Sequence, residues 1–194
     1  RLRMLDRLLV GAERQGIPPV ICANKIDLVT PEEVEAMFGV YTKIGYKVIA
    51  TSAETGEGID RLRDQLENRI SALIGPSGVG KTSLLNTLEP DLGMRVMGIS
   101  DATGKGRHTT TVAELIPLEV GGWVADTPGI RALALFDLDP EEIDAYFPDI
   151  APYVPHCTFS DCSHTVEPGC AVLEALEESK IDEHRYESYV RLHE

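Results

Sequence analysis

The sequence of 194 residues lacks any apolar run of the about 18 residues that a membrane-spanning helix needs. The first ten residues, Arg1 to Val10, mix charges with leucines and end in no small-residue cleavage site, unlike a secretory signal. These absences argue against a membrane protein and a secreted one. We therefore expect a soluble protein of the cytoplasm.

Basic residues are scarce in the last third of the chain. From Arg131 to Glu194 there are 15 Asp and Glu residues against 4 Lys and Arg residues, a net charge of −11 out of −14 for the whole sequence. An acidic surface repels phosphate backbones, so this third alone does not suit nucleic-acid binding. Most of these charges are expected to form a solvated face that keeps the protein soluble.

Hydrophobic residues make up 43% of the sequence, enough for one globular domain with a small appendage. Apolar segments with strand character alternate with amphipathic segments, which predicts an α/β domain with a mainly parallel sheet and one antiparallel edge. Helices are expected near residues 2–15, 58–69 and 81–88, and a further helix is expected to begin at Thr30-Pro31-Glu32-Glu33. Strands are expected near 18–24, 46–53, 70–75, 111–120 and 123–126. Beyond about residue 150 the alternation stops, so we predict a domain of residues 1–150 and a small helical subdomain of residues 151–194.

The segment Gly75-Pro76-Ser77-Gly78-Val79-Gly80-Lys81-Thr82 matches the phosphate-binding pattern G-x-x-x-x-G-K-[ST]. It follows a predicted strand and opens a predicted helix, as this loop requires. Glycines let successive backbone N–H groups turn towards a β-phosphate. Lys81 would bridge the β- and γ-phosphate oxygens, Thr82 would bind Mg²⁺, and Ser83 would join the site in the first helical turn.

The segment Asn24-Lys25-Ile26-Asp27 follows a strand and indicates which base is bound. The Asp27 carboxylate can accept from the ring N–H and the amino group of guanine, whereas adenine would leave this acid unpaired. Asn24 is expected to brace the loops, and the Lys25 stem to lie along the base. Ser52 and Ala53 end the next strand, where a backbone N–H can reach the guanine carbonyl.

Two further segments complete a guanine-nucleotide set. In Asp126-Thr127-Pro128-Gly129, Asp126 can hold Mg²⁺ through water and Gly129 can meet the γ-phosphate. In the segment of residues 106–111, a threonine can complete the Mg²⁺ shell, and we favour Thr110 over Thr109. Ordinary GTPases have the phosphate loop first, but here the base-reading motif precedes it. Such a circular permutation preserves the contacts of the site.

Three cysteines and a histidine lie close together near the C-terminus, as Cys157-x4-Cys162-x-His164-x5-Cys170. Three thiolates and an imidazole can close a tetrahedral zinc site, and with no open position its role would be structural. His156 is a competing imidazole, but we favour His164. Cys22 lies alone on a predicted core strand, where it acts as a small hydrophobic residue.

The permuted order, GPSGVGKT at 75–82, GRHTT at 106–110, DTPGI at 126–130 and the Cys/His cluster together resemble the ribosome small-subunit-dependent GTPase A family. The resemblance covers essentially the whole chain. It implies GTP hydrolysis stimulated by the small ribosomal subunit, contact with its rRNA, and a role in late maturation of that subunit. We expect a monomer without membrane contact that uses Mg²⁺ with GTP or GDP, and structural zinc.

The sequence departs from the family in two respects. Family members carry an N-terminal OB-fold barrel that binds RNA, which is not seen here. A family GTPase domain also has a hydrophobic strand just before the helix that begins this chain, placed centrally in the sheet between the phosphate-loop strand and the base-motif strand. We therefore expect this sequence to be an N-terminally incomplete copy of a longer protein.

Hydrolysis requires a group that orients water. Ras-like enzymes have a glutamine directly after DxxG, but Ile130 occupies that position here. His108, on the loop of residues 106–111, is the best substitute, in agreement with a family suggestion that this histidine is catalytic. The catalytic residues predicted are thus His108 and Lys81. Turnover is expected to be slow until a partner orders the loop.

Other functions remain open from the sequence. The chain could be a nucleotide-gated ribosome-binding module with negligible turnover. It could also be a phosphate-loop kinase or ATPase, in which case ATP would compete with GTP. A permuted GTPase acting on the large ribosomal subunit is a further alternative, against which the Cys/His cluster argues.

Overall fold

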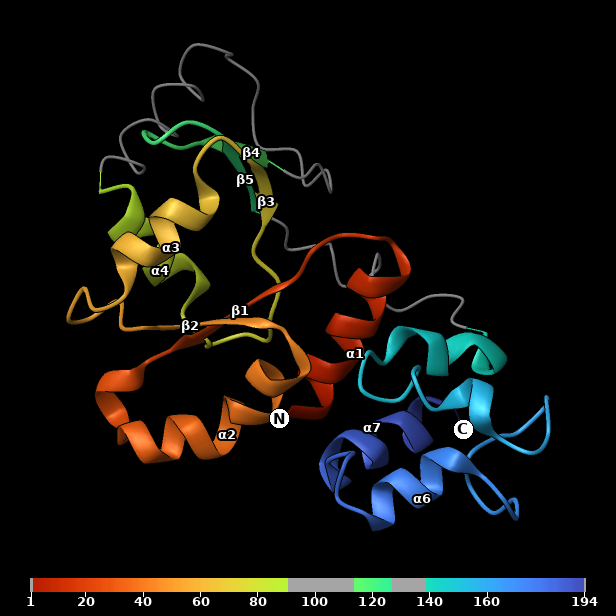
Figure 1. The fold of residues 1–194 in the computed structure, drawn as a ribbon. Helices are drawn as coiled ribbons and strands as arrows, with labels where there is room; N and C mark the ends of the chain where they lie inside the picture. Colours follow the sequence, from red (N-terminus) through yellow and green to blue (C-terminus); the bar gives the residue numbers. More distant parts are fainter. Residues whose placement is uncertain (1, 91–113, 127–138, 194) are drawn as a thin grey trace. The chain divides into compact units, whose positions relative to one another are not determined.

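The computed structural model describes residues 2–90, 114–126 and 139–193 (Figure 1). The chain divides into two compact units. One, here called the sheet unit, comprises Val20–Thr42 and Tyr46–Ile130. The other, the helical unit, comprises Arg1–Pro19, Lys43–Gly45 and Arg131–Glu194. Among the described residues, no helix has both the length and the apolar composition needed to cross a bilayer.

The elements of the sheet unit alternate between strands and helices, as predicted. In chain order they are β1 (Val20–Asn24), η1 (Ile26–Leu28), α2 (Pro31–Ile44), β2 (Lys47–Thr51), α3 (Ile59–Leu66), β3 (Ile70–Ala72), α4 (Lys81–Leu88), β4 (Glu114–Pro117) and β5 (Trp123–Asp126).

The strands pair mainly in parallel. β1 pairs with β2 in parallel, and β3 pairs with β5 in parallel, while β4 is an antiparallel edge on β5. In the described part of the chain these strands form two sheets, of order β1-β2 and β3-β5-β4. The α/β class and the antiparallel edge are therefore as predicted from the sequence.

The hairpin between β4 and β5 has a longer turn than the two glycines suggest. Leu118 and Gly122 extend the pairing, with the Leu118 N–H donating to the Gly122 carbonyl at 3.1 Å. The turn therefore contains three residues and ends at Gly121, whose φ of 81° lies in the left-handed region. The pair Gly121-Gly122 predicts a two-residue hairpin turn from the sequence, and this prediction is wrong because Gly121 occupies the left-handed position of a three-residue loop.

Local sequence signals explain where α2 begins. The Glu33 N–H donates to Thr30 Oγ1 at 3.3 Å, and the Thr30 N–H donates to Glu33 Oε2 at 2.8 Å. This reciprocal pair is a capping box, and Pro31 occupies the first helical position, where no backbone donor is needed. The helix therefore begins where the sequence predicts.

One hydrophobic core holds the sheet unit together. Helices α3 and α4 pack against each other and against the strands through Leu62, Leu66, Leu84, Leu85 and Leu88, which meet Ile49, Ile116 and Val124. Val124 is completely buried at the centre of this contact. Strands β2, β4 and β5 thus contribute apolar side chains to the core that the two helices cover, which helps to fix the positions of the loops at the strand ends.

The helical unit contains α1 (Leu2–Arg14), η3 (Pro140–Tyr146), η4 (Val154–His156), α6 (Ala171–Glu177) and α7 (Glu183–His193). Helix α1 packs against η3 and α7 (Figure 1). Their shared core includes Val10, Ile143, Phe147, Val172 and Tyr189. Helix α1 thus packs within the same unit as the C-terminal helices. The functional division into residues 1–150 and 151–194 stays a prediction.

Candidate nucleotide and metal sites

The glycine-rich loop lies between β3 and α4, as the phosphate-binding pattern requires. Gly78 and Gly80 have φ values of 80° and 97°, a region that side chains disfavour. Helix α4 begins at Lys81, and the Leu84 N–H donates to the Gly80 carbonyl at 2.9 Å. The N–H groups of the first helical turn and the positive end of the helix dipole therefore face this loop. Such a terminus can bind an anion.

Lys81 folds back over the loop that precedes it. Its Nζ donates to the carbonyl oxygens of Gly75 at 2.7 Å and Pro76 at 3.1 Å. Thr82 and Ser83 are exposed in the first turn of α4. An ammonium group and two hydroxyls thus surround the N-terminus of one helix, where a phosphate and a divalent cation could bind together.

The segment Asn24-Lys25-Ile26-Asp27 is tied directly to the glycine-rich loop. The Asn24 side chain donates from Nδ2 to the Val79 carbonyl at 3.0 Å. Lys25, which has a left-handed φ of 70°, donates from Nζ to the Gly78 carbonyl at 2.9 Å. Residues more than fifty positions apart in sequence are thereby brought into one loop cluster.

The same asparagine also holds the end of β2. Asn24 Oδ1 accepts from the Ala53 N–H at 3.3 Å and from Thr51 Oγ1 at 3.4 Å. The α4 side chain Thr87 adds a further link by donating to the Ala53 carbonyl at 3.2 Å. Thr87 could not be predicted from the sequence, because a threonine inside a helix gives no signal of a partner on a distant loop.

Asp27 meets Ser52 at the mouth of this cluster. Ser52 Oγ donates to Asp27 Oδ1 at 2.5 Å and accepts from the Thr55 N–H at 3.1 Å. Ser52 is buried, whereas Asp27 is exposed. A buried hydroxyl therefore orients a carboxylate at the surface, where it can accept hydrogen bonds from a ligand.

The Asp126 backbone lies at the end of β5. Because β5 runs parallel to β3, its carboxyl end lies at the same edge as the glycine-rich loop. The predicted residues Gly129, Thr110 and His108 lie outside the described residues. The described part of the predicted nucleotide set therefore gathers at one edge.

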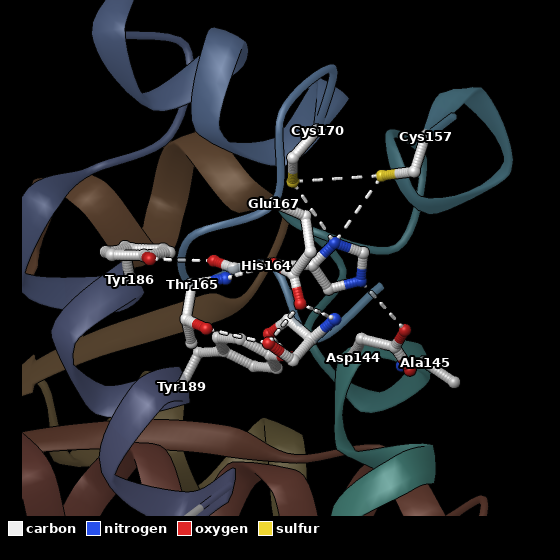
Figure 2. A network of polar contacts seen from close by, with 10 residues as sticks. Asp144, Ala145, Cys157, His164, Thr165, Glu167, Cys170, Tyr186 and Tyr189 are labelled. Carbon is white, nitrogen blue, oxygen red and sulfur yellow. Dashed lines mark hydrogen bonds and ion pairs between the residues drawn. The ribbon is translucent and has the colours of Figure 1, made fainter. Parts of the chain in front are cut away.

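The Cys/His cluster forms in the helical unit as predicted. One possible ligand atom from each of Cys157, Cys162, His164 and Cys170 lies within 4.8 Å of the others. His164 is the imidazole of this group, and His156 is not part of it. Figure 2 shows His164 with two of these cysteines, Cys157 and Cys170.

The spacing of these atoms fits a tetrahedral metal. Cys157 Sγ lies 3.9 Å from Cys170 Sγ, and His164 Nδ1 lies 3.5 and 3.4 Å from the two sulfurs. With Zn–S and Zn–N bonds of about 2.3 and 2.0 Å, tetrahedral geometry requires S–S and S–N separations of roughly 3.8 and 3.5 Å. The residues therefore fit zinc.

Burial disfavours the ionised form of two of the cluster thiols, Cys162 and Cys170. Burial raises the pKa of Cys162 to about 12, and burial also raises the pKa of Cys170. A bound cation would offset this effect by stabilising the thiolates. The donor set of three sulfurs and one nitrogen thus suits a soft or borderline metal ion rather than Mg²⁺ or Ca²⁺.

The family model for RsgA GTPase matches residues 1–136. The small ribosomal subunit biogenesis GTPase RsgA of Gemmatimonas aurantiaca is 52% identical, over 98% of this chain and 62% of that protein. The protein of the same name from Caldanaerobacter subterraneus is 46% identical, over 97% of this chain and 64% of that one.

Two solved structures are similar to the whole chain. YjeQ from Thermotoga maritima superposes with a TM-score of 0.83 at 38% identity, and the chain covers 65% of it. YloQ, a circularly permuted GTPase, superposes with a TM-score of 0.78 at 34% identity, and the chain covers 62% of it. The chain therefore spans less than two thirds of the length of these relatives.

These matches confirm the resemblance drawn from the motifs. They also confirm the fold: a circularly permuted phosphate-loop GTPase domain of α/β class, followed by a small helical part whose Cys/His cluster fits zinc. From the family model over residues 1–136 and the relatives over nearly its full length, the chain belongs to the RsgA GTPase family.

Proposed function

We propose that this chain binds GTP with Mg²⁺, hydrolyses it to GDP and phosphate, and couples hydrolysis to binding and late maturation of the small ribosomal subunit. The observation that carries the proposal is the link between two motifs. Asn24 and Lys25 both donate to carbonyls of the glycine-rich loop, so a base-reading segment and a phosphate-binding segment form one cluster.

The phosphates bind at the N-terminus of α4. Lys81 leaves the loop carbonyls to bridge the β- and γ-phosphate oxygens, since an ammonium gains more from a phosphate than from neutral carbonyls. The loop N–H groups enclose the β-phosphate. The residues that bind the phosphates are Gly75, Ser77, Gly78, Val79, Gly80, Lys81, Thr82 and Ser83.

Guanine binds beside Asp27. Its carboxylate, held through Oδ1 by Ser52, accepts from the ring N–H and the amino group of the base. A backbone N–H where the Ser52-Ala53 segment ends the strand meets the guanine carbonyl, and Lys25 covers the base plane. Specificity for guanine follows because adenine lacks the paired donors that a carboxylate requires.

Residues at and beyond the edge where β3 and β5 end would hold Mg²⁺ and the γ-phosphate. Thr82, Thr110 and Asp126 hold the cation, and Gly129 binds the γ-phosphate. Lys81 stabilises charge on the transferred phosphoryl group, and His108 orients the attacking water. When bound, Mg²⁺ neutralises charge that develops between the β- and γ-phosphates.

Zinc bound by Cys157, Cys162, His164 and Cys170 is structural, because four protein ligands leave no open coordination position. When bound, it links segments that contain few core residues of their own. Residues 1–150 act as the GTPase domain and residues 151–194 as the zinc-binding subdomain. The spacing of the sulfur and nitrogen atoms supports the zinc site.

The partners of this chain are the small ribosomal subunit and its rRNA. The names of the relatives support this proposal, since several are small ribosomal subunit biogenesis GTPases. A protein with these partners acts in the cytoplasm, where we propose that it works as a monomer.

The test is GTP turnover with and without purified small ribosomal subunits, with Lys81→Ala as the inactive control. Stimulation of at least tenfold, absent in the control, is the expected result. Ile130 stands where Ras-like enzymes have their glutamine, which favours a second function, a nucleotide-gated ribosome-binding module with negligible turnover. GTP-dependent binding to the subunit without stimulation of turnover would support this second function. The absence of both binding and stimulation would reject both functions.

A further inference from the structure

The two ring nitrogens of His164 face different partners. Nδ1 faces the sulfurs of Cys157 and Cys170, at 3.5 and 3.4 Å. Nε2 lies 3.3 Å from Asp144 Oδ2 on the other side of the ring (Figure 2). The imidazole is only 1% exposed, so water has little access to either nitrogen. The environment thus distinguishes a metal-facing nitrogen from a carboxylate-facing nitrogen.

Asp144 is itself held in place. Its Oδ1 accepts from the Ala145 N–H at 2.7 Å, which leaves Oδ2 towards the imidazole. It lies on η3, next to Ile143, which is completely buried in the core of the helical unit. The Ala145 N–H and the buried neighbour Ile143 therefore hold the carboxylate in place independently of His164.

We propose that Asp144 is the positioning residue for the metal ligand His164, accepting the Nε2 hydrogen so that the Nδ1 lone pair faces the thiolates. This inference rests on the proposed zinc site. A neutral imidazole can bind a metal through one nitrogen only if the proton sits on the other, and a carboxylate at that nitrogen fixes the tautomer and the ring orientation. The negative charge of the carboxylate also makes the imidazole a stronger electron-pair donor to the metal.

The backbone around His164 is fixed by other groups. His164 has a left-handed φ of 58°, and its carbonyl accepts from Tyr186 Oη at 2.7 Å. The Glu167 carboxylate accepts from the N–H groups of Ser163 and Thr165, at 2.9 and 3.1 Å. Because these contacts do not involve Asp144, loss of its carboxylate should change the imidazole and leave the loop in place.

The contact between Asp144 and His164 should make η3 sensitive to metal binding. Asp144 and His164 are 20 positions apart in sequence, so their contact joins η3 to the segment that carries the cluster. Metal binding should therefore slow hydrogen exchange of the η3 amide groups. The effect should depend on the Asp144 carboxylate, whereas the exchange of β1 and β2 in the sheet unit should not change.

The test is zinc affinity, measured by competition with a chelator of known affinity. Asp144→Ala should weaken zinc binding by about 10- to 100-fold, the usual effect of losing a partner of a ligating histidine. Asp144→Asn should weaken it less, because the amide oxygen still accepts a hydrogen bond. Glu142→Gln is the matched control, since it removes the same charge from an exposed position of η3 and should have no effect.

Two further measurements keep the inference testable if Asp144→Ala fails to fold. The visible absorption of the cobalt-substituted protein should show three sulfurs and one nitrogen in both wild type and Asp144→Asn. The NMR resonance of the His164 Nε2 proton should shift in Asp144→Asn. An unshifted resonance, wild-type affinity in Asp144→Ala, or an equal loss in Glu142→Gln would each overturn the inference. Failure of the wild type to bind zinc or cobalt would instead reject the proposed metal site.

Discussion

The Asp6 carboxylate and the Arg185 guanidinium form an ion pair with 2.6 Å between Oδ1 and Nη1, and neither side chain is exposed to solvent. Arg185 also donates from Nε and Nη2 to the two carboxylate oxygens of Asp149, at 3.1 and 2.8 Å. Its guanidinium carbon lies 4.5 Å from the centre of the Phe147 ring. The network joins α1 and α7, which lie near opposite ends of the sequence.

Removing Asp6 should strongly destabilise the helical unit. Asp6→Ala leaves the buried guanidinium with one carboxylate fewer, and breaking a buried pair in this way lowers the free energy of unfolding by about 3–5 kcal/mol. Denaturant unfolding followed by circular dichroism measures the loss, and hydrogen exchange in α7 assigns it to this unit.

Arg191→Ala is the matched control for this network. Arg191 lies on the same helix and pairs with Glu187 at 3.3 Å, but the two side chains are 42% and 50% exposed. Exposed pairs contribute about 0–1 kcal/mol. Equal losses for Asp6→Ala and Arg191→Ala would mean that the buried network does not stabilise the unit.

A side chain at position 80 should disrupt the link between the two nucleotide motifs. A Cβ atom at Gly80 would clash with Asn24 Nδ2, in addition to the strain of a left-handed φ of 97°. Gly80→Ala should therefore lose the bond from Asn24 to Val79 and weaken GDP binding roughly tenfold, the equivalent of one net hydrogen bond.

Gly56→Ala separates the effect of the clash with Asn24 from the effect of backbone strain. Gly56 has a φ of 80°, but a Cβ atom there would meet no atom within 4 Å. This variant should lose about 1–2 kcal/mol of stability from backbone strain alone and should bind GDP normally. Calorimetric titration with GDP and thermal unfolding give both quantities, and normal GDP binding by Gly80→Ala would contradict the prediction.

The sequence predicted the parts of the site that depend on local patterns. The glycine-rich loop, the Thr30-Pro31 helix start and the Cys/His spacing are short motifs whose residue types determine local geometry. The structure brings each of them together as expected. Asn24 also links the loops through its hydrogen bonds to Val79 and Ala53, because its position directly after a strand determined which neighbours it could reach.

Contacts between distant residues could not be predicted in this way. The spacing of Leu2, Leu5, Leu8 and Leu9 predicts one apolar face for the first helix, but the fully buried residues of α1 include Asp6. An acid is buried there because Arg185, 179 positions later, pairs with it. Asp144 was likewise missed, since its role depends on how η3 packs beside His164 and not on any nearby pattern.

Asp27 should determine the choice of base. Asp27→Asn replaces an acceptor-only carboxylate with an amide, so GTP affinity should fall by about 100-fold or more as two charged hydrogen bonds are lost. Binding of xanthosine nucleotides should rise, because xanthine presents a carbonyl where guanine has its amino group. Asp60→Asn, at an exposed position of α3, is the control. Competition between GTP and XTP measures the change, and unchanged GTP affinity would refute the base-reading role.

Metal removal should distinguish the cluster thiols from Cys22. Burial raises the pKa of the Cys22 thiol, although a hydrogen bond with Thr51 opposes the shift. A raised pKa lowers the thiolate fraction at pH 8, so alkylation of Cys22 should be slow with or without metal. Its rate should rise about tenfold per pH unit while the pH stays below the pKa.

The cluster cysteines should respond to a chelator instead. With zinc bound, their thiolates are protected, and removal of the metal should open the segment and expose Cys157, Cys162 and Cys170 to alkylation. Peptide mapping by mass spectrometry follows each site, and Cys22→Ser should leave the labelling of these three unchanged. Chelator-independent labelling would argue against a metal at the cluster. Labelling of Cys22 as fast as that of the other three would show that burial does not suppress its thiolate.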